Sequence, residues 1–151
     1  MDSCYFPCVK WNSLTDVEFH AFGDAPEKGY GACMYIRSSL PDGAHKSVLV
    51  ASKSRVAPIK TVSLPRLELM GALLCARLVS FVRNALHLSM YTKVFCWTDS
   101  KITLAWIKGD PLKWKMFVAN RVTEIQSVTP PSCWNHCPGS ENPADLFREV
   151  F

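Results

Sequence analysis

The sequence predicts an α/β fold in which a mixed five-stranded sheet is flanked by helices. Three segments with strand-like patterns follow one another with short links, so they are expected to form an antiparallel meander. A long segment with a helical period then precedes a fourth apolar strand, as a parallel addition to a sheet requires. The chain has 151 residues, of which 48% are hydrophobic, and this is enough for one domain with a single core.

The first three strands are expected at residues 16–24, 29–37 and 47–52. In the first of them, Val17 and Phe19 lie on one face because side chains alternate along a strand, and the intervening residues lie on the other. Glycine, proline and aspartate separate the three segments. These are turn-forming residues, so the segments are expected to pair as hairpins.

Residues 1–13 show no clear period and are expected to be an irregular leader, with the domain extending over 14–151. No basic start is followed by an apolar run, and the most apolar stretch, 71–90, is interrupted by Arg77 and Arg83. We therefore expect neither a signal peptide nor a membrane span, and an intracellular protein, cytoplasmic or nuclear, rather than a secreted one.

The period changes to that of a helix at residues 63–88. Ser63 is suited to cap this helix, and Pro65 is suited to its first turn. The apolar residues that recur at spacings of three and four are Leu67, Met70, Leu74, Leu78, Phe81, Val82 and Ala85.

The remaining elements are shorter and are separated by glycine and proline. They are a strand at 93–98, helices at 100–108 and 114–126, a strand at 132–137 and a last helix that Asn142 caps and that has Pro143 at its first position. The sequence ends at Phe151, so this last helix is expected to be truncated, and short helices are marginally stable.

Four acidic residues fall at the ends of these elements. Asp24 and Asp99 end the first and fourth strands, Glu68 lies in the opening turns of the long helix, and Asp145 opens the last helix. If the first and fourth strands pair in parallel, Asp24 and Asp99 lie side by side. Each acid also has a simpler explanation, since acids favour turns and helix starts in general.

If the four carboxylates gather, they repel one another. At about 4 Å and an effective dielectric constant near 20, each like pair costs roughly 4 kcal/mol. A helix N-terminus offsets only about 1 kcal/mol of this. Divalent cations remove the repulsion, and ligands that are all oxygen favour Mg²⁺ or Mn²⁺. Two such ions about 3.5–4 Å apart suit the attack of water on a phosphodiester.

The acids lie in recognisable local sequences: AFGDA at 21–25, LPRLEL at 64–69, WTDS at 97–100 and NPAD at 142–145. In this order they resemble the four acidic motifs of the ribonuclease H fold. FVANRV at 117–122 and PGSENPAD at 138–145 resemble, more narrowly, the ribonuclease H region of BEL/Pao-type retrotransposon polyproteins. The resemblance covers about residues 16–147.

The resemblance implies endonucleolytic hydrolysis of the RNA strand of RNA–DNA hybrids by two metal ions during reverse transcription. Asp24 and Asp99 would bridge or flank both ions, Glu68 would hold one, and Asp145 would complete the other. The implied cofactor is two Mg²⁺ ions, with Mn²⁺ as the alternative. The implied partners are the hybrid and the polymerase and integrase regions of a parent polyprotein.

The sequence departs from the family pattern at two places. The loop at 138–141 lacks the histidine that some members carry before the last acid, and His136 precedes it. Pro26 removes a backbone donor beside Asp24. An alternative stays open because the last helix is truncated and the sequence holds this domain without polymerase or integrase regions. It is a catalytically inactive nucleic-acid-binding or interaction module derived from a retrotransposon.

Several polar and aromatic residues have two interpretations. Ser100, Lys101 and Lys113 are candidate substrate contacts, but Ser100 equally suits a helix start. The net charge of +4 and the pI near 8.7 permit a polyanionic partner without demanding one. The other basic residues of this region suit either a surface that follows the phosphates or a solvated face; they are Lys108, Lys115 and Arg121. For Trp106 and Trp114, core packing is favoured over contact with a sugar or a base.

The seven cysteines are expected to be free thiols. Cys4 and Cys8 share their spacing with Cys133 and Cys137, and His136 lies beside the second pair. A zinc site built from both ends of the chain is therefore an alternative. The spacing within each pair is not the usual one for zinc, and strand-borne cysteines usually point into a core, so core packing is favoured.

Overall fold

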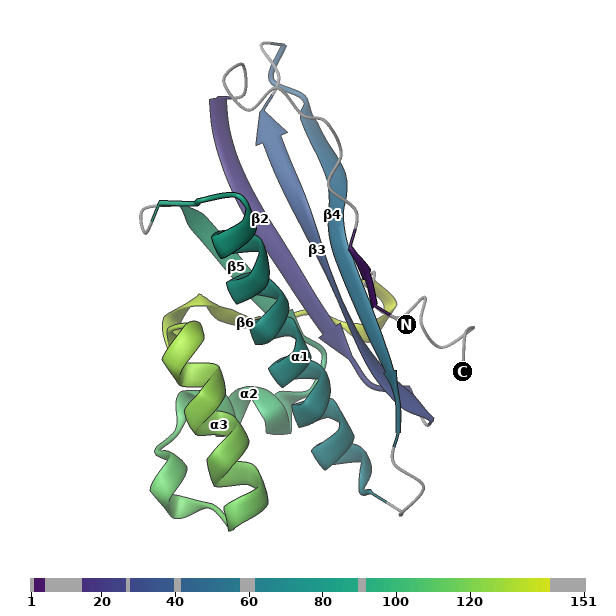
Figure 1. Cartoon of the computed structure of the whole chain (residues 1–151), viewed down its shortest axis with the longest axis vertical. Helices are drawn as coiled ribbons and strands as arrows, with labels where there is room; N and C mark the ends of the chain where they lie inside the picture. Colours follow the sequence, from purple (N-terminus) through teal and green to yellow (C-terminus); the bar gives the residue numbers. More distant parts are fainter. Residues whose placement is uncertain are drawn as a thin grey trace.

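The computed structural model describes residues 2–4, 15–26, 28–39, 42–57, 62–89 and 92–141. They form a six-stranded mixed sheet in the order β1-β4-β3-β2-β5-β6, with helices packed against it (Figure 1). The strands are β1 (Asp2–Cys4), β2 (Thr15–Asp24), β3 (Gly29–Ser39), β4 (His45–Val56), β5 (Lys93–Thr98) and β6 (Trp134–His136). The helices are α1 (Leu64–Ala85), α2 (Lys101–Lys108) and α3 (Met116–Val128), with 3₁₀ turns η2 (Pro111–Lys113), η3 (Pro131–Cys133) and η4 (Gly139–Glu141).

The pairing of the strands confirms the predicted fold class. Strands β2, β3 and β4 form an antiparallel meander, β5 pairs in parallel with β2, and β6 pairs in parallel with β5. Strand β4 is longer than the predicted 47–52, because it pairs with β3 as far as Val56. Its polar residues beyond Ser52 have no apolar alternation, so only the pairing with β3 reveals that they are extended.

Strand β1 corrects the expectation that residues 1–13 are irregular. Asp2–Cys4 pairs antiparallel with β4, in the register Asp2↔Lys53 and Cys4↔Ala51. Main-chain hydrogen bonds along the outer side of β4 hold such a strand without any side-chain pattern, so three residues leave no signal in the sequence. Residues 5–14 and 142–151 lie outside the described residues, so the domain boundary at 14 and the truncated last helix stay predictions.

The core lies between the sheet and α1. Phe19 and Ala21 of β2 are buried on this side, at 1% and 0% exposure, as their alternation predicts. Helix α1 contributes Leu78 and Val82, both fully buried, to the same core. Burial of one such side chain contributes about 1.5–3 kcal/mol, so the apolar stripe of α1 holds the helix on the sheet.

Two glycines set the closest contact between α1 and the sheet. A Cβ atom built on Gly23 would lie 2.8 Å from the carbonyl oxygen of Gly71, and one built on Gly71 would lie 2.8 Å from the carbonyl oxygen of Asp24. These distances are too short for any side chain. The end of β2 therefore touches the backbone of α1 directly.

The ends of the helices differ in detail from the predictions. Ser63 occupies the N-cap position of α1, but its side chain makes no capping hydrogen bond to a described residue. Helix α3 begins at Met116 rather than Trp114, because η2 intervenes and Asp110 caps that turn through Leu112 N. The predicted strand at 132–137 is confined to β6, since η3 precedes it.

Within the described part of the chain, none of the helices combines the length and the apolar character that crossing a membrane would require.

Candidate functional site

Strands β2 and β5 bring Asp24 and Asp99 to one place. Their parallel register ends with the pair Gly23 and Thr98, so each acid directly follows the last residue that β2 and β5 pair with each other. The preceding aromatic residues, Phe22 and Trp97, are paired in the same register and stack with ring centroids 6.2 Å apart. The predicted adjacency of the two acids at the carboxyl ends of neighbouring strands is therefore a feature of the sheet.

Asp24 is buried, with 2% of its surface exposed. Ala25 is also buried, and the carbonyl of Pro26 accepts a hydrogen bond of 3.1 Å from Gly29 N, which closes the link to β3. A carboxylate in such a position carries a desolvation cost that nearby cations or donors must offset. The sharp turn after β2 thus holds an ionisable group in the interior.

Asp99 lies against the segment that follows β6. Its backbone carbonyl is 3.2 Å from Nε2 of His136, and Cys137 N donates to the Thr98 carbonyl at 2.9 Å. A Cβ atom on Gly139 would lie 3.2 Å from Oδ2 of Asp99. The small residue at 139 therefore allows the loop to approach the carboxylate closely.

The carboxylate of Asp99 meets a chemical test for a metal ligand. Its Oδ1 atom is buried and has no hydrogen-bond partner among the described residues. A buried carboxylate oxygen without a partner costs free energy, and a hard divalent cation is the partner that such oxygens prefer. The donor set of Asp24 and Asp99 therefore fits Mg²⁺ or Mn²⁺.

Glu68 is placed by the contact between α1 and β2. It lies three residues before Gly71, so it is a neighbour of Gly71 on the surface of the helix, and Gly71 touches the Asp24 carbonyl. No acid occupies the first turn of α1, so the simpler explanation of Glu68 as a first-turn acid does not apply. Glu68 is half-buried at the end of α1 that meets Asp24.

The fourth predicted acid, Asp145, lies outside the described residues. Within residues 2–4, 15–26, 28–39, 42–57, 62–89 and 92–141, no group of three or more histidine, cysteine, aspartate or glutamate side chains has the arrangement of a metal site. The structure thus brings Asp24 and Asp99 together and fixes the helix that carries Glu68.

Comparison with known families identifies the chain. The family model of the Pao retrotransposon-like RNaseH-like domain matches residues 6–100 of this chain, which include Asp24, Glu68 and Asp99. This chain belongs to that family. No curated protein matches it.

Solved structures agree with the fold of this Pao-type domain. The N-terminal ribonuclease H domain of a Mycobacterium tuberculosis protein, solved as a fusion with maltose-binding protein, has a TM-score of 0.53 and 14% identity, covering 89% of this chain and 94% of that one. Ribonuclease H1 from Halobacterium salinarum has a TM-score of 0.53 and 12% identity, covering 88% and 98%. At these identities the similarity establishes the ribonuclease H fold alone.

Ser100 of the Pao-type domain performs the structural role that the sequence left open. Its Oγ accepts a 3.1 Å hydrogen bond from Thr103 N and caps α2, and the residue is buried. Lys101 and Lys113 are exposed, in α2 and η2 respectively. Their role as substrate contacts stays a prediction.

The tryptophans of this region belong to the core, as predicted. Trp106 and Trp114 are half-buried and meet edge to face, with centroids 6.4 Å apart. Both pack against the buried core. Lys108 and Lys115 are exposed.

Cys133 is part of the protein interior rather than an open metal ligand. Its thiol donates to Sγ of Cys96 at 3.8 Å. This hydrogen bond, and then burial, raise the pKa of Cys133 far above its ordinary value, so the thiol stays protonated. Cys8 lies outside the described residues, as does the side chain of Cys4. The described geometry favours core packing over the zinc alternative.

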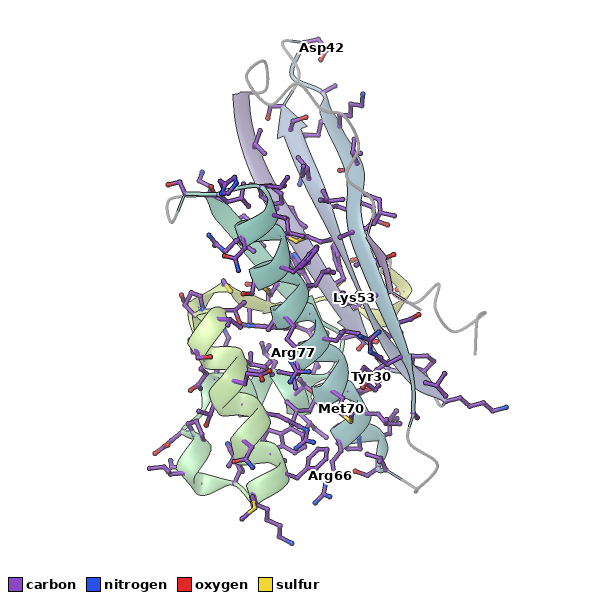
Figure 2. The ribbon with its side chains drawn as sticks, in the orientation of Figure 1. Tyr30, Asp42, Lys53, Arg66, Met70 and Arg77 are labelled. Atoms are coloured by element: carbon purple, nitrogen blue, oxygen red, sulfur yellow. The ribbon has the colours of Figure 1, made fainter. Side chains whose placement is uncertain are left out.

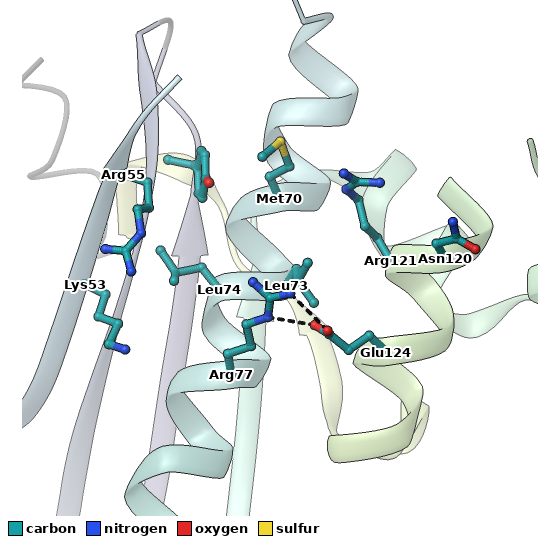
Figure 3. A pocket seen from close by; sticks show the side chains of 10 residues that line it. Lys53, Arg55, Met70, Leu73, Leu74, Arg77, Asn120, Arg121 and Glu124 are labelled. Atoms are coloured by element: carbon teal, nitrogen blue, oxygen red, sulfur yellow. Dashed lines mark hydrogen bonds and ion pairs between the residues drawn. The ribbon is translucent and has the colours of Figure 1, made fainter. Parts of the chain in front are cut away.

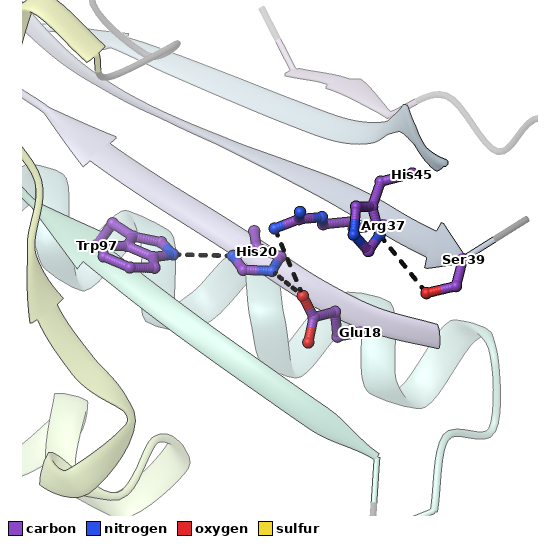
Figure 4. Close-up of polar contacts among 6 residues, drawn as sticks. All are labelled: Glu18, His20, Arg37, Ser39, His45 and Trp97. Atoms are coloured by element: carbon purple, nitrogen blue, oxygen red, sulfur yellow. Dashed lines mark hydrogen bonds and ion pairs between the residues drawn. The ribbon is translucent and has the colours of Figure 1, made fainter. Parts of the chain in front are cut away.

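A polar network on the opposite face of the sheet from α1 was not apparent in the sequence (Figure 4). His20 Nε2 lies 2.9 Å from Oε1 of Glu18, and Trp97 Nε1 donates to His20 Nδ1 at 3.1 Å. Because Nδ1 accepts, Nε2 carries the proton and donates to Glu18. This hydrogen bond is the largest cause of the lowered pKa of Glu18.

Glu141 is a further acid near the site, and no sequence pattern pointed to it. It lies in η4 and lines a hollow on the open face of the sheet together with Phe22 and Tyr35. The pKa of Cys137 is raised, first by burial and then by the negative charges of Glu141 and Asp99. Glu141 and Asp99 therefore both contribute to the negative potential at Cys137.

Proposed function

We propose that this domain is a ribonuclease H that hydrolyses the RNA strand of RNA–DNA hybrids with two divalent cations. The observation that carries the proposal is the parallel register of β2 and β5. It sets Asp24 beside Asp99, whose buried Oδ1 has no partner among the described residues. Membership of the Pao retrotransposon-like family supports a role in reverse transcription of a retrotransposon.

Each acid has a separate role in this proposal. Asp24 and Asp99 would hold both ions, Glu68 would hold one of them, and Asp145 would complete the other. When bound, Mg²⁺ or Mn²⁺ would supply Lewis-acid chemistry to the attacking water and to the phosphate. The chain itself orients the carboxylates: the turn after β2 fixes Asp24, the loop at Gly139 confines Asp99, and the contact at Gly71 sets the helix of Glu68.

The proposal extends to substrate and partners. Ser100 retains its hydroxyl hydrogen while its Oγ accepts from Thr103 N, so it is able to donate to a phosphate oxygen. Lys101 and Lys113 offer exposed ammonium groups to the phosphates of the hybrid. The parent polyprotein supplies polymerase and integrase regions, and the reaction takes place inside the cell, in the cytoplasm or the nucleus.

The test is cleavage of an RNA–DNA hybrid whose RNA strand is labelled. The purified domain should cut it internally in the presence of Mg²⁺, leaving 3′-hydroxyl ends. Asp99→Asn should lower the rate at least about a hundredfold, the loss typical when one preorganised charge-stabilising group is removed. Asp42→Asn makes the same chemical change at an exposed turn residue and should leave the rate unaltered.

The same assay distinguishes the nuclease from a second candidate function. The second candidate is an inactive binding module, and the loop at 138–141 lacks the histidine that some members of the family carry. Such a module would bind the hybrid in a salt-dependent manner, indifferent to Asp99→Asn, and would cleave nothing at any metal concentration. Absence of cleavage with intact binding would overturn the nuclease proposal.

A further inference from the structure

A hollow of about 340 Å³ lies between the β3–β4 hairpin, α1 and α3 (Figure 3). Four basic side chains line it: Lys53, Arg55, Arg77 and Arg121. One acid, Glu124, lines it as well, and side chains of α1 such as Leu74 form its apolar floor. The basic residues come from three separate elements, so their spacing in the sequence does not predict that they gather.

The hollow is distinct from the acidic site. Lys53 of β4 is paired with Ala32, which is fully buried on the α1 side of the sheet. On α1, Arg77 lies nine positions after Glu68, which places the two about 180° apart around the helix. The basic hollow therefore lies on the opposite side of α1 from Glu68, the predicted metal ligand. Figure 2 labels Arg77, Lys53 and Tyr30, three of the residues that line the hollow.

Basic residues outnumber acids among the described residues that line the hollow. Arg77 donates two hydrogen bonds, of 2.8 and 3.0 Å, to the carboxylate of Glu124, so the charge of this acid is paired with that of Arg77. Lys53 and Arg121 face the same space as Arg77 (Figure 3). The pKa of Arg121 is lowered, first by burial and then by the charge of Arg77, which indicates that the cations are close enough to repel. An anion in the hollow would offset this repulsion.

The guanidinium groups are held in position. Arg121 stacks on the ring of Phe117 with Cζ 3.6 Å from the centroid, and it donates to the Phe117 carbonyl at 3.0 Å. Arg77 is fixed by Glu124. A guanidinium has five N–H donors, so after these bonds each group retains donors for a ligand. Side chains that are fixed in advance lose little entropy when an anion binds.

The chemistry favours phosphate. A phosphate group presents several charged oxygens to the planar fork of arginine, which binds it in a bidentate manner. Tyr30 and Asn120, which also line the hollow, add neutral donors. The volume is at the lower end of the range for ligand sites and suits one or two backbone phosphates with a sugar.

We propose that this hollow binds backbone phosphates of a nucleic-acid strand, at a second site separate from the acids at the ends of β2 and β5. The site anchors the strand electrostatically and takes no part in hydrolysis. Its binding requires no metal ion, so it is measured in the presence of a chelator.

The experiment measures anisotropy of a labelled single-stranded DNA oligonucleotide, which is not a substrate of the proposed hydrolysis. The full chain, Lys53→Glu and Lys46→Glu are compared over a range of salt concentrations. Lys46 is an exposed lysine on the same strand, outside the hollow, so the two variants have the same net charge. Lys53→Gln is a second variant that removes the charge without reversing it.

Lys53→Glu should weaken binding at least about tenfold and Lys53→Gln by a smaller factor, because each removes a hydrogen bond to a charged group. The plot of log affinity against log salt concentration should become less steep, by about 0.7 for each phosphate that the protein no longer neutralises. Lys46→Glu should have little effect.

Equal effects of Lys53→Glu and Lys46→Glu would overturn the proposal, as would no effect of either. Polyglutamate that competes as well as the oligonucleotide, with the same dependence on Lys53, would show a general anion site and would overturn the assignment to nucleic acid. Because neither cleavage nor metal enters the assay, failure of the nuclease proposal leaves its outcome unaffected.

Discussion

Replacing Gly71 by alanine tests whether the contact between α1 and β2 sets the geometry of the acidic site. The added Cβ would lie 2.8 Å from the Asp24 carbonyl oxygen and 3.2 Å from its carbonyl carbon. Both partners are backbone atoms, which cannot move aside as a flexible side chain does. The helix must therefore shift away from β2 and carry Glu68 with it.

Two opposing effects decide the change in stability. Alanine is favoured over glycine inside a helix by about 1 kcal/mol. Overpacking a close contact costs about 1–3 kcal/mol. The steric cost should prevail, so we expect Gly71→Ala to destabilise the domain by about 1 kcal/mol. This corresponds to a decrease in Tm of about 2–4 °C for a domain of this size.

The assay is urea unfolding, combined with cleavage of the labelled hybrid at a temperature where the variant is folded. Displacement of Glu68 should reduce the rate by up to about a hundredfold. Gly23→Ala opens the same gap from the other side, because its Cβ would meet the Gly71 carbonyl at 2.8 Å. The double variant should therefore cost less than the sum of the single ones. Stabilisation by Gly71→Ala with unaltered cleavage would refute the reasoning.

Two further predictions concern stability. The pKa of Glu18 is lowered by its hydrogen bond to His20, so this carboxylate stabilises the fold above its ordinary pKa of 4.5 and the contribution is lost as the pH falls through the lowered value. Glu18→Gln should therefore reduce stability at neutral pH and flatten the acid limb of stability against pH; an unchanged acid limb would contradict this. Trp134 is fully buried and donates through Nε1 to Thr129 Oγ1 at 2.9 Å, so Trp134→Phe should cost about 1–3 kcal/mol in urea unfolding. A loss below about 0.5 kcal/mol would show that this hydrogen bond contributes little.

The alternation of apolar and polar residues in the strands and the helical spacing of apolar residues made most of the fold predictable. The burial of Phe19 and Ala21 in β2 follows from the alternating side-chain pattern, in which Val17 is partly buried. The long helix follows from its apolar spacing. The adjacency of Asp24 and Asp99 required one further step, parallel pairing across the intervening helix. These features are local in sequence or follow from general rules of chain connection.

Other features depend on long-range contacts that no local pattern encodes. Strand β1 is held by main-chain pairing with β4, so its three residues carry no signal. The close approach of Gly23 and Gly71 joins residues far apart in the chain, and a glycine alone does not reveal its neighbour. Stacking of Arg121 on Phe117 is compatible with helical spacing, but the basic hollow beside it requires β4 and α1 as well.

The central claim is that Asp24 and Asp99 together bind divalent cations, and binding of Mn²⁺ measured by electron paramagnetic resonance tests it most directly. Free Mn²⁺ is titrated against the domain, Asp99→Asn and Asp42→Asn. We expect that the domain and Asp42→Asn bind Mn²⁺ alike, that Mg²⁺ competes, and that Asp99→Asn loses at least one site. Equal Mn²⁺ binding by all three proteins would contradict the claim. Mn²⁺ binding that added Mg²⁺ does not reduce would contradict it as well.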